Sequence, residues 1–282
     1  SNCSENAPWA DPGSFLFWGG PDGFDPERKL VLPTFRTHGS AIGDFRHAGY
    51  LDVVAVGFCN PELLIFRGGP NGLDVTDPQR LMLDPSIEGF VNSRDTGAVS
   101  ALSPNRDLNH PRWLFTADFN NDGWLDLYLG TGDAYFQALM PNRMFRNGGG
   151  QGFQDVTTSG GFGLIQKGHG VAFGDIDQDG DQDVFAAMGG AYEGDLARNV
   201  LFQNPGHGNH SLTLRLVGQA TNRSAIGARV TVGFSDAGVS REVHRMVTSG
   251  SSFGGNPLRL DIGLGQSVGP VSVSVLWPTT GL

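Results

Sequence analysis

The sequence predicts an all-β fold in which a four-stranded unit repeats along the chain and a smaller β unit follows it. Two observations carry this prediction. An aspartate-rich loop flanked by strand-like runs occurs in full at Asp118 and again at Asp175, 57 residues later, and once in degenerate form. Glycine accounts for 43 of 282 residues, about twice its usual share, and follows no collagen-like period. This composition indicates many tight turns and therefore many short strands.

The first repeated element is the loop with its two flanking runs. Its full copies are WLFTADFNNDGWLDLYLG (113–130) and GVAFGDIDQDGDQDVFAAMG (170–189), and its degenerate copy is SAIGDFRHAGYLDVVAVG (40–57). The second element is an apolar strand, a Gly-rich turn and another strand, with NVLFQNPGHG (199–208) as its last copy. Four phenylalanines align in it: Phe17, Phe66, Phe145 and Phe202. Four short strands in about 50 residues are typical of one blade of a β-propeller.

These repeats assign residues 1–208 to a partial β-propeller. Residues 1–33 supply only the second half of a blade, and a polar insertion at about 84–111 separates the degenerate loop from the first full one. Residues 209–282 are predicted to form a second all-β unit. Five of its segments alternate apolar and polar side chains, as half-buried strands do: HSLTLRLVG, ARVTVGF, REVHRMVT, LRLDIGLG and VSVSVLW. The chain begins inside a blade and ends at a turn, which predicts truncation at both ends.

Charge and composition argue against several classes of protein. Residues 1–208 carry 26 acidic and 13 basic side chains, net −13, whereas residues 209–282 carry 3 and 6, net +3. An acidic first part argues against nucleic-acid binding because it would repel the phosphates. No apolar run approaches the roughly 18 residues of a membrane helix, and no signal peptide opens the chain. Cys3 and Cys59 lack a metal-binding spacing. They either form a disulfide or stay free thiols.

The two full loops carry the oxygen ligands that Ca²⁺ prefers. Carboxylates this close repel one another, and a folded protein rarely keeps such a cluster without a cation. In the pattern D-x-D-x-D-G-x-x-D, the predicted ligands are the side chains at positions 1, 3, 5 and 9 and the carbonyl at position 7. We therefore predict two calcium sites, formed by Asp118, Asn120, Asp122, Trp124 (carbonyl) and Asp126, and by Asp175, Asp177, Asp179, Asp181 (carbonyl) and Asp183. A solvated acidic turn is the alternative for each loop.

The loops differ from an EF-hand, although the two share positions 1 to 9. An EF-hand needs a bidentate Glu at position 12 and a helix on each side. Position 12 is Leu129 in one loop and Ala186 in the other, and the flanks are strand-like. In the degenerate loop, Arg46 stands at ligand position 3. We expect no metal there, and we expect the Arg46 guanidinium to bridge Asp44 and Asp52 instead.

These loops resemble FG-GAP (VCBS) repeats, the calcium-loop blades of integrin α-subunit propellers and of many bacterial surface proteins. The tail is similar to the ASPIC/UnbV domain in GNHSLTLRLVGQATNRSAIGARVTV, SGSSFGGNPLRLDIGLG and VSVSVLWP. The pairing resembles the cartilage acidic protein family and its bacterial relatives. The resemblance implies an extracellular or cell-surface calcium-binding propeller with a role in adhesion or interaction, and it implies no established catalytic reaction.

The sequence thus predicts a non-enzymatic module, secreted or at the cell surface, or periplasmic or on the outer surface in a bacterium. Calcium would stabilise its blades, and its partner would be an unidentified protein or glycan. No G-x-S-x-G nucleophile elbow occurs in the sequence. The alternative is a carbohydrate-active enzyme or lectin that uses the propeller face. Four tryptophans are candidates for stacking on sugars: Trp9, Trp18, Trp113 and Trp124. Arg223 and Arg229 are candidates for an anionic glycan, or else for a salt bridge to the acidic propeller.

Overall fold

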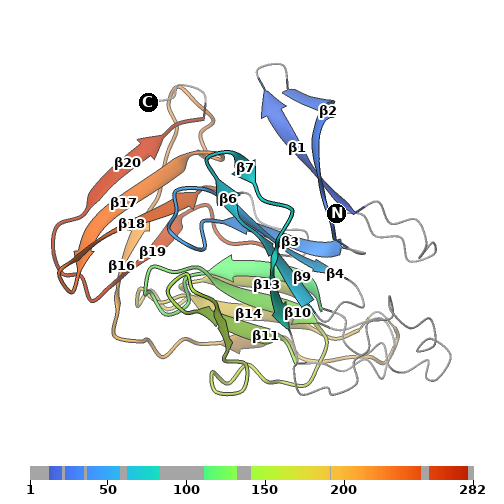
Figure 1. Ribbon diagram of the computed structural model, residues 1–282. Helices are drawn as coiled ribbons and strands as arrows, with labels where there is room; N and C mark the ends of the chain where they lie inside the picture. Colours follow the sequence, from blue (N-terminus) through green and yellow to red (C-terminus); the bar gives the residue numbers. More distant parts are fainter. Residues whose placement is uncertain are drawn as a thin grey trace.

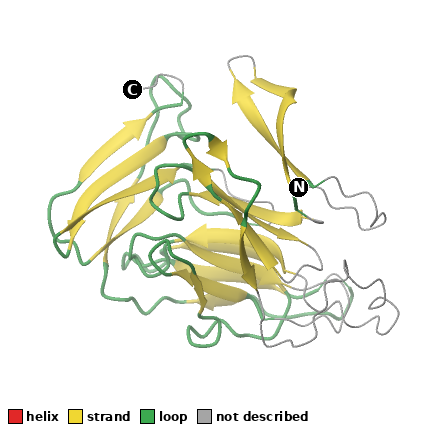
Figure 2. Cartoon of the chain, viewed as in Figure 1, coloured by secondary structure: helices red, strands yellow, loops and turns green. Residues whose placement is uncertain are grey.

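The computed structural model describes residues 13–20, 23–34, 37–57, 62–82, 111–131, 141–190, 192–248 and 254–278. Every regular element in these parts is a β-strand, and they contain no helix (Figure 2). A search of the same residues finds no helix able to cross a membrane. The protein is therefore all-β, as predicted: a partial β-propeller followed by a small β domain (Figure 1).

Several predictions fall outside these residues or are not tested by them. Cys3, Cys59, Trp9 and nearly all of the insertion at 84–111 lie outside the described ranges. The division of the chain at residue 208 and the truncation at both ends stay predictions.

The strands form three blades and an N-terminal hairpin, and the pair Thr131↔Gly168 joins blades 2 and 3 into one seven-stranded sheet. Blade 1 contains β3 (Thr37–Gly43), β4 (Asp52–Gly57), β5 (Glu62–Phe66) and β8 (Gln79–Met82), with the short hairpin β6 (Gly68–Gly69) and β7 (Gly72–Leu73). Blade 2 contains β9 (Pro111–Ala117), β10 (Asp126–Thr131), β11 (Arg143–Asn147) and β12 (Phe153–Asp155). Blade 3 contains β13 (Gly168–Gly174), β14 (Asp183–Met188) and β15 (Val200–Phe202). The hairpin is β1 (Ser14–Gly20) with β2 (Gly23–Leu32), which pair only with each other; the assignment of this part to half a blade stays a prediction.

Blades 1 and 2 have the four strands expected of each repeat, but blade 3 differs. The last copy of the second element was expected to supply a third and a fourth strand, and it supplies only β15. The following segment turns instead: Gly206 and Gly208 have φ angles of 78° and 71°, and the Gly206 amide donates to Asn204 Oδ1 at 3.1 Å. The chain then enters a different sheet at His210. No described strand pairs with the outer edge of β15.

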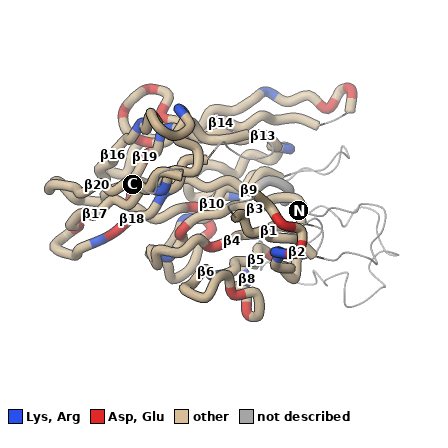
Figure 3. The backbone as a smooth tube through the Cα atoms, turned by 90° about the horizontal axis from the view of Figure 1, so that it is seen from above, with Lys and Arg blue, Asp and Glu red and all other residues tan. Residues whose placement is uncertain are grey.

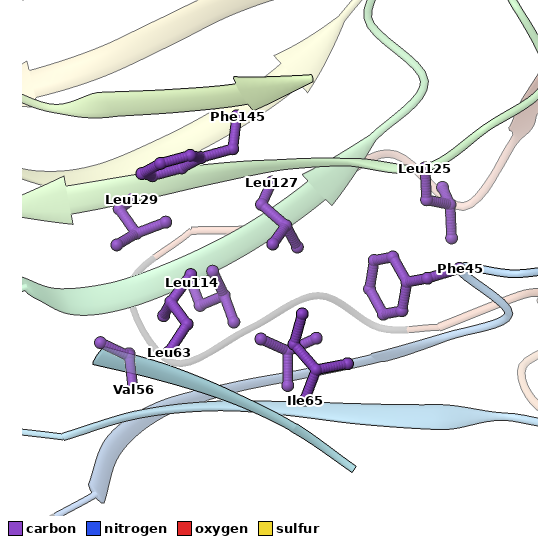
Figure 4. Packing of buried hydrophobic residues seen from close by; sticks show 10 residues of the cluster. Phe45, Val56, Leu63, Ile65, Leu114, Leu125, Leu127, Leu129 and Phe145 are labelled. Atoms are coloured by element: carbon purple, nitrogen blue, oxygen red, sulfur yellow. The ribbon is translucent and has the colours of Figure 1, made fainter. Parts of the chain in front are cut away.

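The blades pack face to face, and the alternation of side chains along β10 shows how. Leu127 and Leu129 point to the core between blades 1 and 2, where they meet residues such as Ile65 (Figure 4). Tyr128, between them in sequence, belongs to the core between blades 2 and 3. Successive side chains on a strand point to opposite faces. Leu127, Tyr128 and Leu129 are all fully buried, so blade 2 is covered on both faces.

The five strands predicted in the tail are all present. They are β16 (His210–Leu214), β17 (Arg229–Asp236), β18 (Val239–Met246), β19 (Leu260–Gly265) and β20 (Ser272–Leu276), called here the C-terminal unit. One sheet has the order β18-β17-β20, and the other pairs β16 with β19. They share a core of Val230, Val232, Phe234, Val243, Ile262 and Leu264. The C-terminal unit gathers at one side of the blades (Figure 1).

Candidate metal centre

The three aspartate loops occupy equivalent places in the three blades. We call them loop 1 (44–52), loop 2 (118–126) and loop 3 (175–183). Each joins the first two strands of its blade, and the ninth loop residue pairs across the sheet with the residue before the loop: Gly43↔Asp52, Ala117↔Asp126 and Gly174↔Asp183. The next residue pairs with an aligned phenylalanine: Val53↔Phe66, Leu127↔Phe145 and Val184↔Phe202. The alignment of repeats made from sequence is therefore also the structural one.

The first aspartate of each loop organises the turn. Asp175 accepts hydrogen bonds from the amides of Asp179 (3.0 Å) and Gly180 (3.3 Å). Asp118 Oδ2 accepts one from the amide of Gly123 at 3.0 Å. The glycines at position 6 of loops 2 and 3 have φ angles of 91° and 95°, a region that favours glycine. The sharp turn predicted at position 6 is therefore real.

The ninth aspartate has both oxygens bonded to the backbone. Asp126 accepts from the amides of Asn147 (2.7 Å) and Phe119 (3.0 Å). Asp183 accepts from the amides of Asn204 (2.8 Å) and Ile176 (2.9 Å). Position 9 thus ties the start of its loop to the end of the third strand. Whether these two carboxylates also bind a cation stays a prediction.

Two asparagines extend this link to the neighbouring blade, and sequence reasoning missed them. Asn147 Nδ2 donates to the carbonyls of Phe45, in loop 1, and Leu125, both at 3.0 Å. Asn204 Nδ2 donates to the carbonyls of Phe119, in loop 2, at 2.8 Å and of Gln182 at 3.2 Å. Both follow an aligned phenylalanine by two positions, which is the signal that could have identified them.

Loop 3 brings three predicted ligands together. Asp175, Asp177 and Asp179 each offer an oxygen atom, and the three atoms lie within 4.8 Å of one another. Asp177 and Asp179 are exposed, and Asp175 is half-buried. A set of hard carboxylate oxygens on one open loop is the donor set that suits Ca²⁺. These residues can therefore hold a metal ion.

Loop 2 has fewer carboxylates and is far more buried. Position 3 is Asn120, whose Nδ2 donates to Asp122 Oδ2 at 2.9 Å. The side chain of Asp118 is 2% exposed, and its Oδ1 is buried with no hydrogen-bond partner. Burial raises the pKa of Asp118 to about 7, and burial together with Asp118 raises the pKa of Asp126. A buried, unpartnered carboxylate oxygen fits a site that takes a cation.

Trp124 and Asp181, the position-7 residues of loops 2 and 3, contact the neighbouring loop. Trp124 stacks on His47 of loop 1, with ring centroids 3.7 Å apart and planes at 4°. Burial and then Arg245 lower the pKa of His47 to about 4, so this ring is neutral at pH 7. Asp181 accepts a hydrogen bond from Asn121 Nδ2 of loop 2 at 2.7 Å. The three loops therefore form one continuous surface.

Loop 1 holds a guanidinium among its carboxylates, with a geometry that differs in part from the prediction. Arg46 pairs with Asp52 through Nη2 at 2.7 Å and also donates to the carbonyl of Gly68 at 2.8 Å. Asp44 is held by backbone instead, since it accepts from the amides of Ala48 (2.9 Å) and Gly49 (2.8 Å). The turn itself satisfies Asp44, so the guanidinium does not bridge the two acids.

The residues proposed for sugar or anion binding are placed less favourably. The indole ring of Trp124 already stacks on His47 and contacts Arg241, whose guanidinium carbon lies 5.4 Å from the ring centroid. Trp18 is 43% exposed on the N-terminal hairpin, and the side chain of Trp113 lies outside the described part. Arg223 and Arg229 are exposed. The arginines of the C-terminal unit that reach the acidic loops are others: Arg241, Arg245 and Arg259.

Comparison with protein families agrees with this architecture. Residues 118–186, which include loops 2 and 3, match the model of the FG-GAP-like repeat. Residues 218–281, which include most of the C-terminal unit, match the model called ASPIC and UnbV. No functionally curated protein matches the chain.

Proposed function

We propose that this chain, which carries an FG-GAP-like repeat and an ASPIC/UnbV domain, is a calcium-binding β-propeller module that acts in adhesion or in protein or glycan interaction. It would be secreted or exposed at the cell surface, where it would bind a protein or a glycan. The observation that carries the calcium proposal is the carboxylate group of loop 3, where Asp175, Asp177 and Asp179 place three oxygens within 4.8 Å.

Calcium would be held in loop 3 by Asp175, Asp177, Asp179, Asp183 and the carbonyl of Asp181. Loop 2 would offer a second set in Asp118, Asn120, Asp122, Asp126 and the carbonyl of Trp124. When bound, the ion supplies positive charge that offsets repulsion among the carboxylates. The protein itself keeps each loop in the turn conformation that points the ligand side chains inward. It does so through the hydrogen bonds of the position-1 aspartate and the positive φ of the glycine at position 6. Ion binding then becomes folding energy.

Calorimetric titration with calcium tests this proposal. We expect binding in the range of about 0.1–1 mM, as in extracellular calcium modules. Asp177→Asn should weaken binding, because it removes one negative charge from the exposed ligand set and leaves only an amide oxygen at position 3, as Asn120 does in loop 2. Glu193→Gln is the matched control, since Glu193 is an exposed acid between β14 and β15, outside loop 3. Equal binding by wild type and Asp177→Asn would contradict the site, and so would no binding at millimolar calcium.

Thermal unfolding gives an independent readout. An ion present at 100 times its dissociation constant stabilises the folded state by about 2.7 kcal/mol. The melting temperature of wild type should therefore fall when a chelator replaces calcium, while that of Asp177→Asn should fall less. The match to the FG-GAP-like repeat supports the role in interaction. Calcium-dependent retention of the protein on a glycan array or on matrix proteins would test that role. Equal retention with and without calcium would contradict it.

A further inference from the structure

The C-terminal unit places arginines directly on loop 2. Arg245 of β18 donates through Nη2 to the carbonyl of Gly123 at 2.9 Å, and the same nitrogen lies 3.5 Å from Asp118 Oδ2. Its side chain is only 7% exposed. Arg241, on the same strand, donates to the carbonyl of Asp122 at 2.8 Å. In Figure 3, basic segments of the C-terminal strands lie beside acidic segments of the blades.

The backbone of β19 completes the contact. The amide of Gly263 donates to Asp118 Oδ2 at 3.0 Å, and the amide of Gly265 donates to the carbonyl of Asn121 at 2.9 Å. Gly263 allows this approach, because a Cβ there would lie 2.3 Å from the carbonyl carbon of Asn121. One oxygen of Asp118 therefore serves its own loop, through Gly123, and the C-terminal unit at the same time.

We infer that Arg245 and a calcium ion compete for loop 2, so that the docked C-terminal unit holds this loop shut and leaves loop 3 as the open site. The inference rests on the calcium binding proposed above. Asp118 already carries a guanidinium and two amides on Oδ2 while Oδ1 is buried and unpartnered. An ion at Oδ1 would bring like charge close to Arg245 and would have to enter beneath the C-terminal unit.

Loop 3 provides the contrast within the same molecule. Arg259 lies 3.5 Å from Asp175, but its side chain is 28% exposed and it also pairs with Asp261 at 3.0 Å. Asp177 and Asp179 are exposed to solvent. Calcium can reach these carboxylates without moving the C-terminal unit, so loops 2 and 3 differ in access although they share a sequence pattern.

Coupling of this kind is reciprocal. If docking weakens the affinity of loop 2 for the ion by some factor, the ion weakens docking by the same factor. High calcium would therefore loosen the C-terminal unit from the blades. The surface that it releases includes Arg241, Arg245 and the loop 2 backbone, which makes the contact a calcium-sensitive interface inside one chain.

Terbium luminescence can read loop 2 alone. Tb³⁺ replaces Ca²⁺ in oxygen sites and emits when a nearby indole transfers energy to it. Trp124 is part of loop 2, whereas loop 3 contains no tryptophan. Loops 2 and 3 touch through Asn121 and Asp181, so indole-excited emission reports the ion in loop 2 when it is lost in Trp124→Phe and kept in Asp177→Asn. The titration uses the full 282-residue chain.

Two variants should open the loop by different routes. Arg245→Gln removes the competing charge, and Gly263→Ala blocks docking sterically while every charge stays in place. Both should lower the half-saturating Tb³⁺ concentration by about tenfold, within the usual range of coupling between sites. Arg229→Gln, an exposed arginine on β17, is the control and should titrate like wild type. Unchanged or weaker binding in both variants would overturn the inference.

The same measurements separate this inference from the function on which it rests. Calorimetric binding of calcium that depends on Asp177 tests loop 3, irrespective of Arg245. If loop 3 binds and Arg245→Gln leaves the loop 2 emission unchanged, only the competition is wrong. If neither loop responds to metal, the calcium function itself fails. Small-angle scattering should also show wild type expanding at the Tb³⁺ concentration that saturates Trp124-sensitised emission.

Discussion

Replacing Asn147 with alanine tests the link between blades 1 and 2. The side chain donates to the carbonyls of Phe45 and Leu125, both at 3.0 Å, and accepts from the amide of Gly150 at 2.8 Å. Asn147 is 2% exposed and Phe45 is equally buried, so water cannot easily replace the lost partners. At about 1 kcal/mol for each net hydrogen bond, the variant should lose about 3 kcal/mol of unfolding free energy.

The assay is urea unfolding followed by circular dichroism, with a thermal melt beside it. For a domain of this size, 3 kcal/mol corresponds to a fall in melting temperature of about 6–12 °C. Gln154→Ala is the control, because it removes an exposed side-chain hydrogen bond to Arg146 and should cost less than about 0.5 kcal/mol. A loss below about 1 kcal/mol for Asn147→Ala would refute the idea that this side chain joins the blades.

Two further predictions concern the carboxylates. The pKa of Asp118 in the calcium-free protein is raised to about 7, chiefly by burial, so its stabilising contribution is complete below about pH 4 and is lost as the pH rises through 7. Urea unfolding without calcium should therefore show wild type losing up to about 4 kcal/mol relative to Asp118→Asn between pH 4 and pH 8, and a rise would contradict this. The double change Arg46→Asp with Ala48→Asp rebuilds the full D-x-D-x-D-G-x-x-D pattern in loop 1. It should add one calcium-binding event by calorimetry, and an unchanged stoichiometry would count against the ligand pattern.

Much of the fold could be predicted because each repeat specifies itself locally. In all three blades the ninth aspartate pairs with the residue before its loop, and the residue after that aspartate pairs with the aligned phenylalanine. Turn glycines, apolar alternation and the position-6 glycine are short-range signals, and all of them reappear in the structure. The five strands of the C-terminal unit were also found, because alternation is strong in each of them.

The parts that could not be predicted depend on contacts between distant segments. Asn147 and Asn204 bond carbonyls in the preceding blade, and Arg245 reaches loop 2 from 127 residues away. Nothing in the local sequence distinguishes Arg245 from the exposed Arg229. The absence of a fourth strand in blade 3 could not be predicted either. After β15 the chain continues to β16 in another sheet, and a Gly-rich turn is equally compatible with a hairpin and with a change of sheet.

The ninth aspartate accepts two hydrogen bonds from backbone amides, one at each carboxylate oxygen. These bonds determine which parts of such a repeat can change without loss of its fold. Asp126 and Asp183 brace the backbone through amides that need no metal, whereas Asp177 and Asp179 of loop 3 face solvent and accept one hydrogen bond each, from Gln203 and from the Asp181 amide. Loop 1 shows that these two tasks can be inherited separately: Asp52 still holds the Gly68 amide at 2.8 Å although Arg46 sits at a ligand position. A blade of this kind can keep its shape without the full set of ligand positions, which leaves each loop free to acquire a different occupant.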